Sequence, residues 1–452
     1  MGDASPQRPA GRWRRLSREG FWVLAGQVAS FIGALALVRL LTDRISPFEY
    51  GRLALGLTLA GLVNQVIVGG LTLGIGRFQA IASEARDAEG FLKASAALMA
   101  RASAAVLALA AAVCLGMVLA GQTPWLPLSL VVFGYALSSG WSGAIATLQN
   151  AARQRGVVAV HTGLEPWLRL LLIAFSLRWL GPSAVAVAWG YTIASLLVTV
   201  SQLRWLGLWW RRERRRAGAL PADPGRWRRE IWAYSWPLST WGLFSWAQQS
   251  SDRWALERFA SSADVAQYVV LFQLGYAPLS MVSGLVASLL GPVLFQRAGA
   301  ADDAARTRDV HRLTWRVSLV GLLASAGLTA LALLLHRPLF QLLVAADFRP
   351  ISIYLPWLVL AGCLFTIGQI LALKLMAEKR SEALKVVKIN TCIGATGLNI
   401  LGAKFYGMPG VVGAVVLFSL VYFVWMLLLC RSTGSSGALP ATPGNPVSPL
   451  SA

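Results

Sequence analysis

Long runs of apolar residues, each about twenty residues or more, recur along the chain and constrain its fold more than any other feature. Residues 104–120 form one such run, and the first run begins at Phe21. Because lipid offers no partner to backbone polar groups, only helices or a closed barrel can span a bilayer. The runs are uninterrupted rather than alternating, which indicates helices. The sequence therefore predicts an all-α polytopic membrane protein.

A criterion of about twenty apolar residues per span predicts about twelve transmembrane helices. Their expected limits are 21–41, 51–75, 93–120, 124–150, 158–180, 183–205, 231–253, 265–294, 312–335, 351–376, 385–405 and 409–430. The first run is too long for a signal-peptide core, and no small-residue cleavage site follows it, so we expect a retained helix. The spans fall into two lobes of about six helices around a central cavity, a common transporter plan.

The polar stretches divide the chain into five parts. We expect a basic N-terminal tail at 1–20, a first lobe at 21–205, a basic cytoplasmic linker at 206–230, a second lobe at 231–430, and a C-terminal tail at 431–452. The arginine-rich linker is expected to be solvated and to contact lipid rather than a protein partner. The last tail is rich in Ser, Pro and Gly, which predicts disorder.

The chain carries a formal net charge of +21, although only 13% of its residues are charged and 56% are hydrophobic. The positive residues are spread over short links between apolar runs, which excludes a nucleic-acid-binding surface. Alternate links hold most of the Arg and Lys, and this asymmetry predicts that both termini are cytoplasmic. No nucleotide, hydrolase or metal motif occurs, and the three histidines are scattered, so we expect no cofactor and no enzymatic activity.

Three short motifs occur in a fixed order along the apolar runs. They are Ser-Pro-Phe-Glu-Tyr-Gly at residues 46–51, Ser251-Asp252-Arg253 leading to Phe259, and Gly-Met-Pro-Gly-Val-Val-Gly-Ala at residues 407–414. Residues 46–49 also align with residues 261–264, which indicates that one hairpin is used twice. With these motifs, residues 21–430 resemble the O-antigen and polysaccharide flippases, lipid-linked oligosaccharide transporters of the multidrug/oligosaccharidyl-lipid/polysaccharide exporter superfamily.

This resemblance implies two lobes that open alternately to each side of a bacterial inner membrane. The implied substrate is an oligosaccharide on a polyprenyl pyrophosphate, carried to the periplasmic leaflet during surface polysaccharide or lipopolysaccharide biosynthesis. Membrane lipids are expected partners, together with a polysaccharide polymerase and chain-length machinery. A multidrug exporter of the same superfamily and a membrane-embedded glycan polymerase or ligase are the alternatives.

A pyrophosphate needs fixed cationic donors, and arginine supplies them in a planar fork. Arg39 and Arg253 each lie roughly 31 Å along their helices from the cytoplasmic end, and they align in the repeat to within one position. Two such cations facing one cavity can hold a pyrophosphate, with Asp252 beside them. Anchoring at the lipid interface is the alternative for both arginines.

Three further residues are candidates for substrate binding. Arg169 lies roughly 21 Å past Arg155 along its helix, near mid-membrane, and Glu165 precedes it by four residues, so the two can pair. A pair within the membrane marks a functional site or stabilises the lobe. Arg77 follows Gly74 and Gly76, whose small size lets a helix or a headgroup approach closely.

The acidic residues Glu49 and Asp264 flank the two repeated links. Because acidic side chains are favourable at helix N-termini, we expect both to cap the helices that follow, rather than to couple transport to protons.

Overall fold

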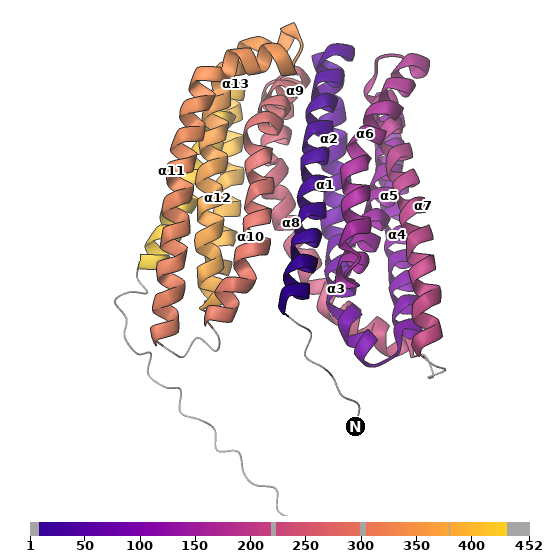
Figure 1. Ribbon diagram of the computed structural model, residues 1–452. Helices are drawn as coiled ribbons and strands as arrows, with labels where there is room; N and C mark the ends of the chain where they lie inside the picture. The colour runs from indigo at the N-terminus through magenta and orange to yellow at the C-terminus, as the bar shows by residue number, and fades with distance from the viewer. Residues whose placement is uncertain (1–8, 218–222, 299–303, 379, 432–452) are drawn as a thin grey trace, which may run out of the picture.

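The computed structural model describes residues 9–217, 223–298, 304–378 and 380–431, and every regular element within them is a helix. Figure 1 shows two groups of long, roughly parallel helices, with α1–α7 on one side and α9–α13 on the other. Helix α8 packs against both and is counted with the second group. The predicted all-α fold is confirmed. In the orientation of Figure 1, the helix bundle has a lower end, where α1 begins and α13 ends, and an opposite upper end.

The first seven helices account for the predicted spans before the linker. They are α1 Pro9–Arg44, α2 Pro47–Val63, α3 Gly69–Glu84, α4 Ala88–Leu119, α5 Leu126–Ala151, α6 Arg155–Leu180 and α7 Ala184–Ala217. A π-helix, η1 Asn64–Val68, joins α2 to α3, and a short 3-10 helix, η2 Thr123–Trp125, leads into α5.

The remaining helices begin after the linker. They are α8 Pro224–Phe259, α9 Ser262–Leu271, α10 Ala277–Ala298, α11 Ala304–Leu343, α12 Leu355–Ala377 and α13 Ser381–Arg431. The π-helix η3 Phe272–Tyr276 joins α9 to α10, and a 3-10 segment, η4 Ala346–Tyr354, precedes α12. Both π-helices therefore interrupt the second span of their group, a feature that the repeat in the sequence did not reveal.

The number of crossings is close to the predicted twelve. Within the described residues, 10 helical segments are long and apolar enough to cross a membrane. One of them contains most of α13, which turns back at Gly407 with a φ of 63°, as expected between the spans predicted at 385–405 and 409–430. The 36-residue helix α8 is not among the 10, because polar residues dilute its apolar runs.

The repeated motif residues start the second span of each group, as expected. Ser46 caps α2 by accepting a hydrogen bond from the Glu49 amide at 3.3 Å, and Ser261 caps α9 by accepting one from the Asp264 amide at 3.1 Å. Each acid lies in the first helical turn, where the helix dipole favours negative charge. The Glu49 carboxylate also accepts a hydrogen bond of 2.7 Å from the amide of Ala184 at the start of α7.

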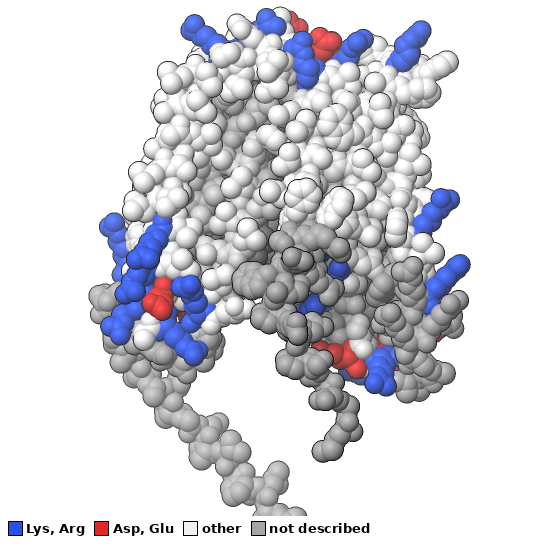
Figure 2. All heavy atoms as spheres, in the orientation of Figure 1, with Lys and Arg blue, Asp and Glu red and all other residues white. Residues whose placement is uncertain are grey.

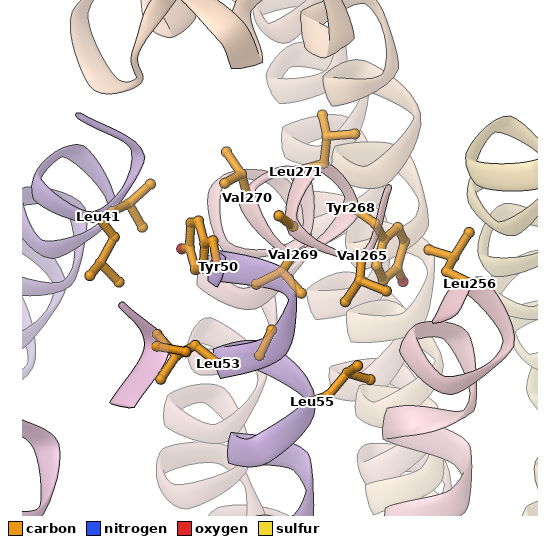
Figure 3. Packing of buried hydrophobic residues seen from close by; sticks show 14 of the residues in the cluster. Leu41, Tyr50, Leu53, Leu55, Leu256, Val265, Tyr268, Val269, Val270 and Leu271 are labelled. Carbon is orange, nitrogen blue, oxygen red and sulfur yellow. The ribbon is translucent and has the colours of Figure 1, made fainter. Parts of the chain in front are cut away.

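An apolar core joins the two groups near the upper end. Figure 3 shows Tyr50 and Leu53 of α2 among Val269 and Val270 of α9, all within one buried cluster. The backbones approach so closely that a Cβ added to Gly51 would lie 1.8 Å from the carbonyl oxygen of Ser262. Glycine at this motif position is therefore required by the contact between α2 and α9.

Helix α8 is bound to the first group at its lower end. Trp227 is fully buried between Phe78 and Phe91, and its indole N–H donates to Asp87 at 2.8 Å. Asp87 caps α4 and also accepts a hydrogen bond from the Asp223 amide at 3.0 Å. Burial alone would raise the pKa of Asp87, but these hydrogen bonds and the one from Gly90 outweigh burial and lower its pKa.

Further along, α8 packs against the second group. Ser251 accepts a hydrogen bond of 3.0 Å from Asn399 of α13, and the thiol of Cys392 donates to the carbonyl of Phe244. Helix α8 thus contacts both groups, and the division of the chain at the linker stays a prediction. Helices α7 and α8 extend into the predicted linker, and the tail at 432–452 lies outside the described residues.

Charged side chains avoid the middle of the molecule on the face shown in Figure 2. Lys and Arg gather at the upper rim and toward the lower end, and the band between them is almost entirely uncharged. This distribution, together with the 10 apolar segments among the described residues, identifies a multi-pass membrane protein.

Candidate functional site

A polar cavity of about 310 Å³ lies inside the second group of helices. Its walls come from α8, from the α9–η3–α10 span, and from α12 and α13. The polar and charged side chains that line it are Ser245, Gln248, Gln249, Asp252, Ser280, Gln369, Lys388, Thr391 and Asn399. Seven phenylalanine and tyrosine rings and one tryptophan also line this region, so it combines hydrogen-bonding groups with aromatic faces. These residues are Trp241, Phe244, Tyr268, Phe272, Tyr276, Phe365, Phe418 and Tyr422.

The sequence of α8 explains why one of its faces is polar here. Trp241, Ser245, Gln248 and Asp252 follow each other at spacings of three or four residues, which places them along one face of the helix. Arg253 is rotated by about 100° from Asp252. Two residues that are adjacent in the sequence therefore point to different surroundings.

The Asp252 carboxylate is held by donors within the second group. Its Oδ2 accepts a hydrogen bond of 2.6 Å from the Tyr268 hydroxyl, and its Oδ1 accepts one of 2.7 Å from the backbone amide of Arg253. Asp252 is only 3% exposed, and Tyr268 is fully buried. In the part of the chain that the structure describes, no cation forms an ion pair with this carboxylate.

Arg253 is a half-buried cation that forms no ion pair among the described residues, and the carboxylate of its neighbour Asp252 acts on its side chain through charge alone. Its guanidinium lies 5.2 Å from the ring centre of Phe272, and its buried Nε makes no hydrogen bond. The neighbouring residue of η3, Gln273, accepts a hydrogen bond of 3.2 Å from the Tyr50 hydroxyl of α2. Arg253 therefore lies beside the contact between the two groups.

Arg39 takes part directly in that contact. Its Nη1 donates a hydrogen bond of 2.5 Å to the carbonyl of Val344, in the link between α11 and η4. Thr42, about one helical turn further along α1, reinforces the contact by accepting a hydrogen bond of 3.2 Å from the Ala345 amide. We call these contacts, together with the Tyr50–Gln273 and Gly51–Ser262 contacts, the upper joint.

Glu165 and Arg169 form the ion pair predicted from their spacing on α6. Arg169 also donates to the Tyr135 hydroxyl at 3.1 Å, and its guanidinium lies 5.0 Å from the ring centre of Tyr191. These tyrosines belong to α5 and α7, so the pair is enclosed within the first group. The structure does not bring Arg169 into the polar cavity or the upper joint.

Arg77 lies on α3 and is exposed. The close approach predicted for the glycines before it is confirmed, because a Cβ added to Gly74 would lie 2.2 Å from the Ser235 hydroxyl oxygen and one added to Gly76 would lie 2.8 Å from Thr147. Helix α8 and helix α5, rather than a headgroup, occupy that space.

Sequence analysis missed most of the polar cavity. Gln369, Thr391 and Asn399 are polar residues within apolar runs, and that signal could have found them. The aromatic lining carries no comparable signal, because rings at helical spacing are common in apolar cores. Among the residues that the structure describes, no three His, Cys, Asp or Glu side chains gather as a metal site.

The arrangement of these helices is similar to that of solved transporters. An inward-facing structure of a multidrug resistance MATE family transporter of the MOP superfamily is 14% identical, with a TM-score of 0.60 and coverage of 93% of this chain and 94% of that chain. Lipid II flippase MurJ, in an inward closed conformation, is 10% identical, with a TM-score of 0.66 and coverage of 91% of this chain and 87% of that chain. A MOP superfamily transporter from Pyrococcus furiosus is 13% identical, with a TM-score of 0.53 and coverage of 92% and 96%.

The fold is therefore that of the MOP superfamily, whose matched members are membrane transporters and flippases rather than enzymes. No curated protein matched the sequence. Residues 16–297, more than half of the chain, match the family described as "Polysaccharide biosynthesis protein", and the chain belongs to that family. The resemblance to polysaccharide flippases seen in the three motifs is thus confirmed at the level of the family.

Proposed function

We propose that the protein is a flippase that moves oligosaccharide linked to polyprenyl pyrophosphate from the cytoplasmic to the periplasmic leaflet of a bacterial inner membrane. The export would serve the synthesis of lipopolysaccharide or another surface polysaccharide and would proceed by alternating access. The observation that carries this proposal is membership of the polysaccharide biosynthesis family on a fold shared with a lipid II flippase. Both termini would then be cytoplasmic, with the upper end of the bundle in the periplasm.

Arg253 is the residue that we propose for contact with the pyrophosphate. It lies at the junction of the two groups and forms no ion pair in the described chain, so its guanidinium N–H groups are available to a ligand. An unpaired, half-buried guanidinium is costly to keep away from water, and a pyrophosphate would compensate that cost by accepting charge-assisted hydrogen bonds.

Arg39 would join Arg253 when the upper joint opens. In this conformation its guanidinium donates to the Val344 carbonyl, which belongs to the opposite group of helices. Separation of the groups at the upper end removes that acceptor and frees the cation. The two arginines would then assist release of the pyrophosphate on the periplasmic side, while the Glu165–Arg169 pair and Arg77 serve as further candidates along the path.

Reconstitution tests the activity directly. Proteoliposomes that contain the purified protein and a fluorescent polyprenyl-pyrophosphate oligosaccharide should expose the lipid on the opposite leaflet, and Arg253→Ala should slow this exposure. Arg178→Ala, which removes an exposed arginine of α6, is the matched control and should transport normally. In cells, deletion should cause lipid-linked oligosaccharide to build up in the cytoplasmic leaflet, and normal surface polysaccharide after deletion would contradict the proposal.

One observation favours a second function, the export of organic cations. The polar cavity places the Asp252 carboxylate among aromatic rings, and this combination can bind a cation. A deletion strain with altered drug susceptibility and normal glycans would favour this alternative over the flippase. A glycan polymerase or ligase needs a larger platform than the described upper-end links at residues 45–46, 120–122, 181–183, 260–261 and 344–345 and the turn at Gly407 provide.

A further inference from the structure

A second pocket, of about 590 Å³, lies outside the polar cavity and is strongly basic. It is formed by α4, by α8 and by the junction of η1 with α3. One side of it is lined by arginines and tryptophans, namely Arg101, Arg228, Arg229, Trp232 and Trp236. The floor of the pocket is apolar and consists of Val66, Ile67, Leu71, Leu98, Ala102 and Ala105. No carboxylate lines this basic pocket.

Helical geometry explains how α8 presents four of these side chains together. Trp227 points into the first group, where it is fully buried. At about 100° per residue, Arg228, Arg229, Trp232 and Trp236 all fall within a stripe of about 100° centred on the opposite side of α8. The hydrogen bond from Trp227 to Asp87 therefore fixes the rotation of α8 that directs both arginines toward α4.

Arg101 completes the basic pocket from α4. Leu98 and Ala105 share its helical face, because they lie three residues before it and four residues after it, and Ala102 borders that face. A long side chain on a helix is directed toward the helix N-terminus, which for α4 is the lower end, where Arg228 and Arg229 lie. The three arginines thus line one pocket from two helices.

The positive charge of the basic pocket is not neutralised by the protein. Arg101, Arg228 and Arg229 make no hydrogen bond or ion pair with any residue that the structure describes. The nearest acid along α8, Glu230, is bound by Arg226 at 2.8 Å. An anion is therefore the expected occupant, and arginine forks match the oxygens of a phosphate.

The surroundings of the basic pocket show that this anion is amphipathic. Only 17% of the most apolar window of α4 is buried inside the protein, so most of this window faces lipid. Trp232 and Trp236 are 55% and 54% exposed, and tryptophans with one polar edge favour the level of the lipid headgroups. A chain can lie on the apolar floor while the phosphate meets the arginines.

We propose that the basic pocket binds an anionic phospholipid by its phosphate group, in the leaflet at the lower end of the bundle. Basic pockets between transmembrane helices are known to hold anionic headgroups. Because the arginines come from α4 and α8, the bound lipid would bridge the first group of helices and the helix that contacts both groups. The lipid would thus stabilise the position of α8.

Lipid binding can be measured without transport, so failure of this inference is distinguishable from failure of the proposed function. The purified protein would be placed in nanodiscs with phosphatidylglycerol or phosphatidylcholine, and retained phospholipid would be counted by native mass spectrometry. The triple variant Arg101→Gln, Arg228→Gln, Arg229→Gln should bind phosphatidylglycerol more than about tenfold more weakly than the wild type. Replacement of all three by lysine should restore part of the binding, because the charge remains but the fork is lost.

The matched control removes the same charge elsewhere. Arg204→Gln, Arg211→Gln, Arg316→Gln alters exposed arginines of α7 and α11 that lie outside the basic pocket, and it should retain the lipid. Equal retention of phosphatidylglycerol by the wild type and the pocket variant would overturn the proposal. So would arginine-dependent binding of undecaprenyl pyrophosphate without binding of phosphatidylglycerol, since the pocket would then belong to the transported lipid.

Discussion

Arg169 on α6 and Arg253 on α8 are both half-buried arginines of the membrane part, and their surroundings differ. Arg169 pairs with Glu165, donates to Tyr135 and lies over the ring of Tyr191. Arg253 has one aromatic neighbour, Phe272, and no acidic partner in the described chain. The first group uses its arginine to hold three helices together, whereas the second leaves its arginine available where the groups meet. A buried charge that the protein satisfies is structural, and one that it leaves unsatisfied is the better candidate for ligand binding.

The largest expected effect is on stability and tests the structural role of Arg169. Arg169→Ala leaves the Glu165 carboxylate enclosed without its partner and should lower the free energy of unfolding by about 3 kcal/mol. Chemical unfolding in detergent micelles measures the change. The double variant Glu165→Gln, Arg169→Ala should recover part of the loss, because no unpaired charge remains. An unchanged free energy of unfolding in Arg169→Ala would show that the Glu165–Arg169 pair does not stabilise the fold and would make it a candidate for ligand binding.

Asp252 lies next to Arg253, but like Arg169 it has hydrogen-bond partners within the protein for its charged group. Asp252→Ala removes the acceptor of the fully buried Tyr268 hydroxyl and should lower the free energy of unfolding by about 2 kcal/mol. Asp252→Asn keeps an oxygen acceptor and should cost less than about 1 kcal/mol. The same micelle measurement applies. Equal losses in the two variants would show that the charge, and not the hydrogen bond, is what matters.

Arg253→Ala should affect transport rather than stability. Its rate of lipid-linked oligosaccharide transport should fall about tenfold, equivalent to about 1.4 kcal/mol in the barrier. Its free energy of unfolding should change by less than about 1 kcal/mol, because only the contact with Phe272 is lost. Proteoliposome transport and micelle unfolding would be measured on the same preparation. A large loss of stability with normal transport in Arg253→Ala would show that Arg253, like Arg169, has a structural role.

Arg39 is intermediate, since its partner is a neutral carbonyl on the opposite group. Arg39→Ala should weaken the upper joint by about 1 kcal/mol and shift the population toward an open upper end. Spin labels at the exposed positions Arg44 and Ala346 would report longer distances in the variant. Arg39→Lys, which retains a donor, is the control. Identical distance distributions in the wild type and Arg39→Ala would contradict a role in holding the joint.

Asp87 extends the comparison to a satisfied carboxylate outside the membrane. Because its pKa is lowered in the folded protein, its contribution is complete above the ordinary aspartate pKa and is lost as the pH falls through the lowered value. The effect should be less than about 1 kcal/mol. The melting temperature of the wild type should therefore fall more on acidification than that of Asp87→Asn. Parallel pH profiles would show that the hydrogen bonds to Asp87 contribute no pH dependence.

Local features of the fold could be predicted from the sequence because they depend on residues within a few positions of each other. The apolar runs and the pairing of Glu165 with Arg169 are of this kind, and the structure contains them. Glu49 and Asp264 lie at the helix starts as predicted, but the side chains that cap these helices are those of Ser46 and Ser261. The turn at Gly407 also follows from its own sequence, since glycine accepts the positive φ that ends one span and starts the next.

Other features depended on which helices pack together, and the sequence could not supply them. The carbonyl of Val344, which accepts the hydrogen bond from Arg39, lies 305 residues away in the sequence. The ring of Phe272 belongs to a π-helix that no sequence pattern predicted. The sequence by itself determined a membrane-spanning helical chain and the approximate positions of its spans, because these follow from hydrophobicity; the helices themselves extend beyond several predicted spans, as α1, α8 and α11 do. The tertiary structure decided that Asp252 accepts a hydrogen bond and that Arg253 forms no ion pair among the described residues, because the packing of α8 against the α9–η3 span places Tyr268 beside one and Phe272 beside the other.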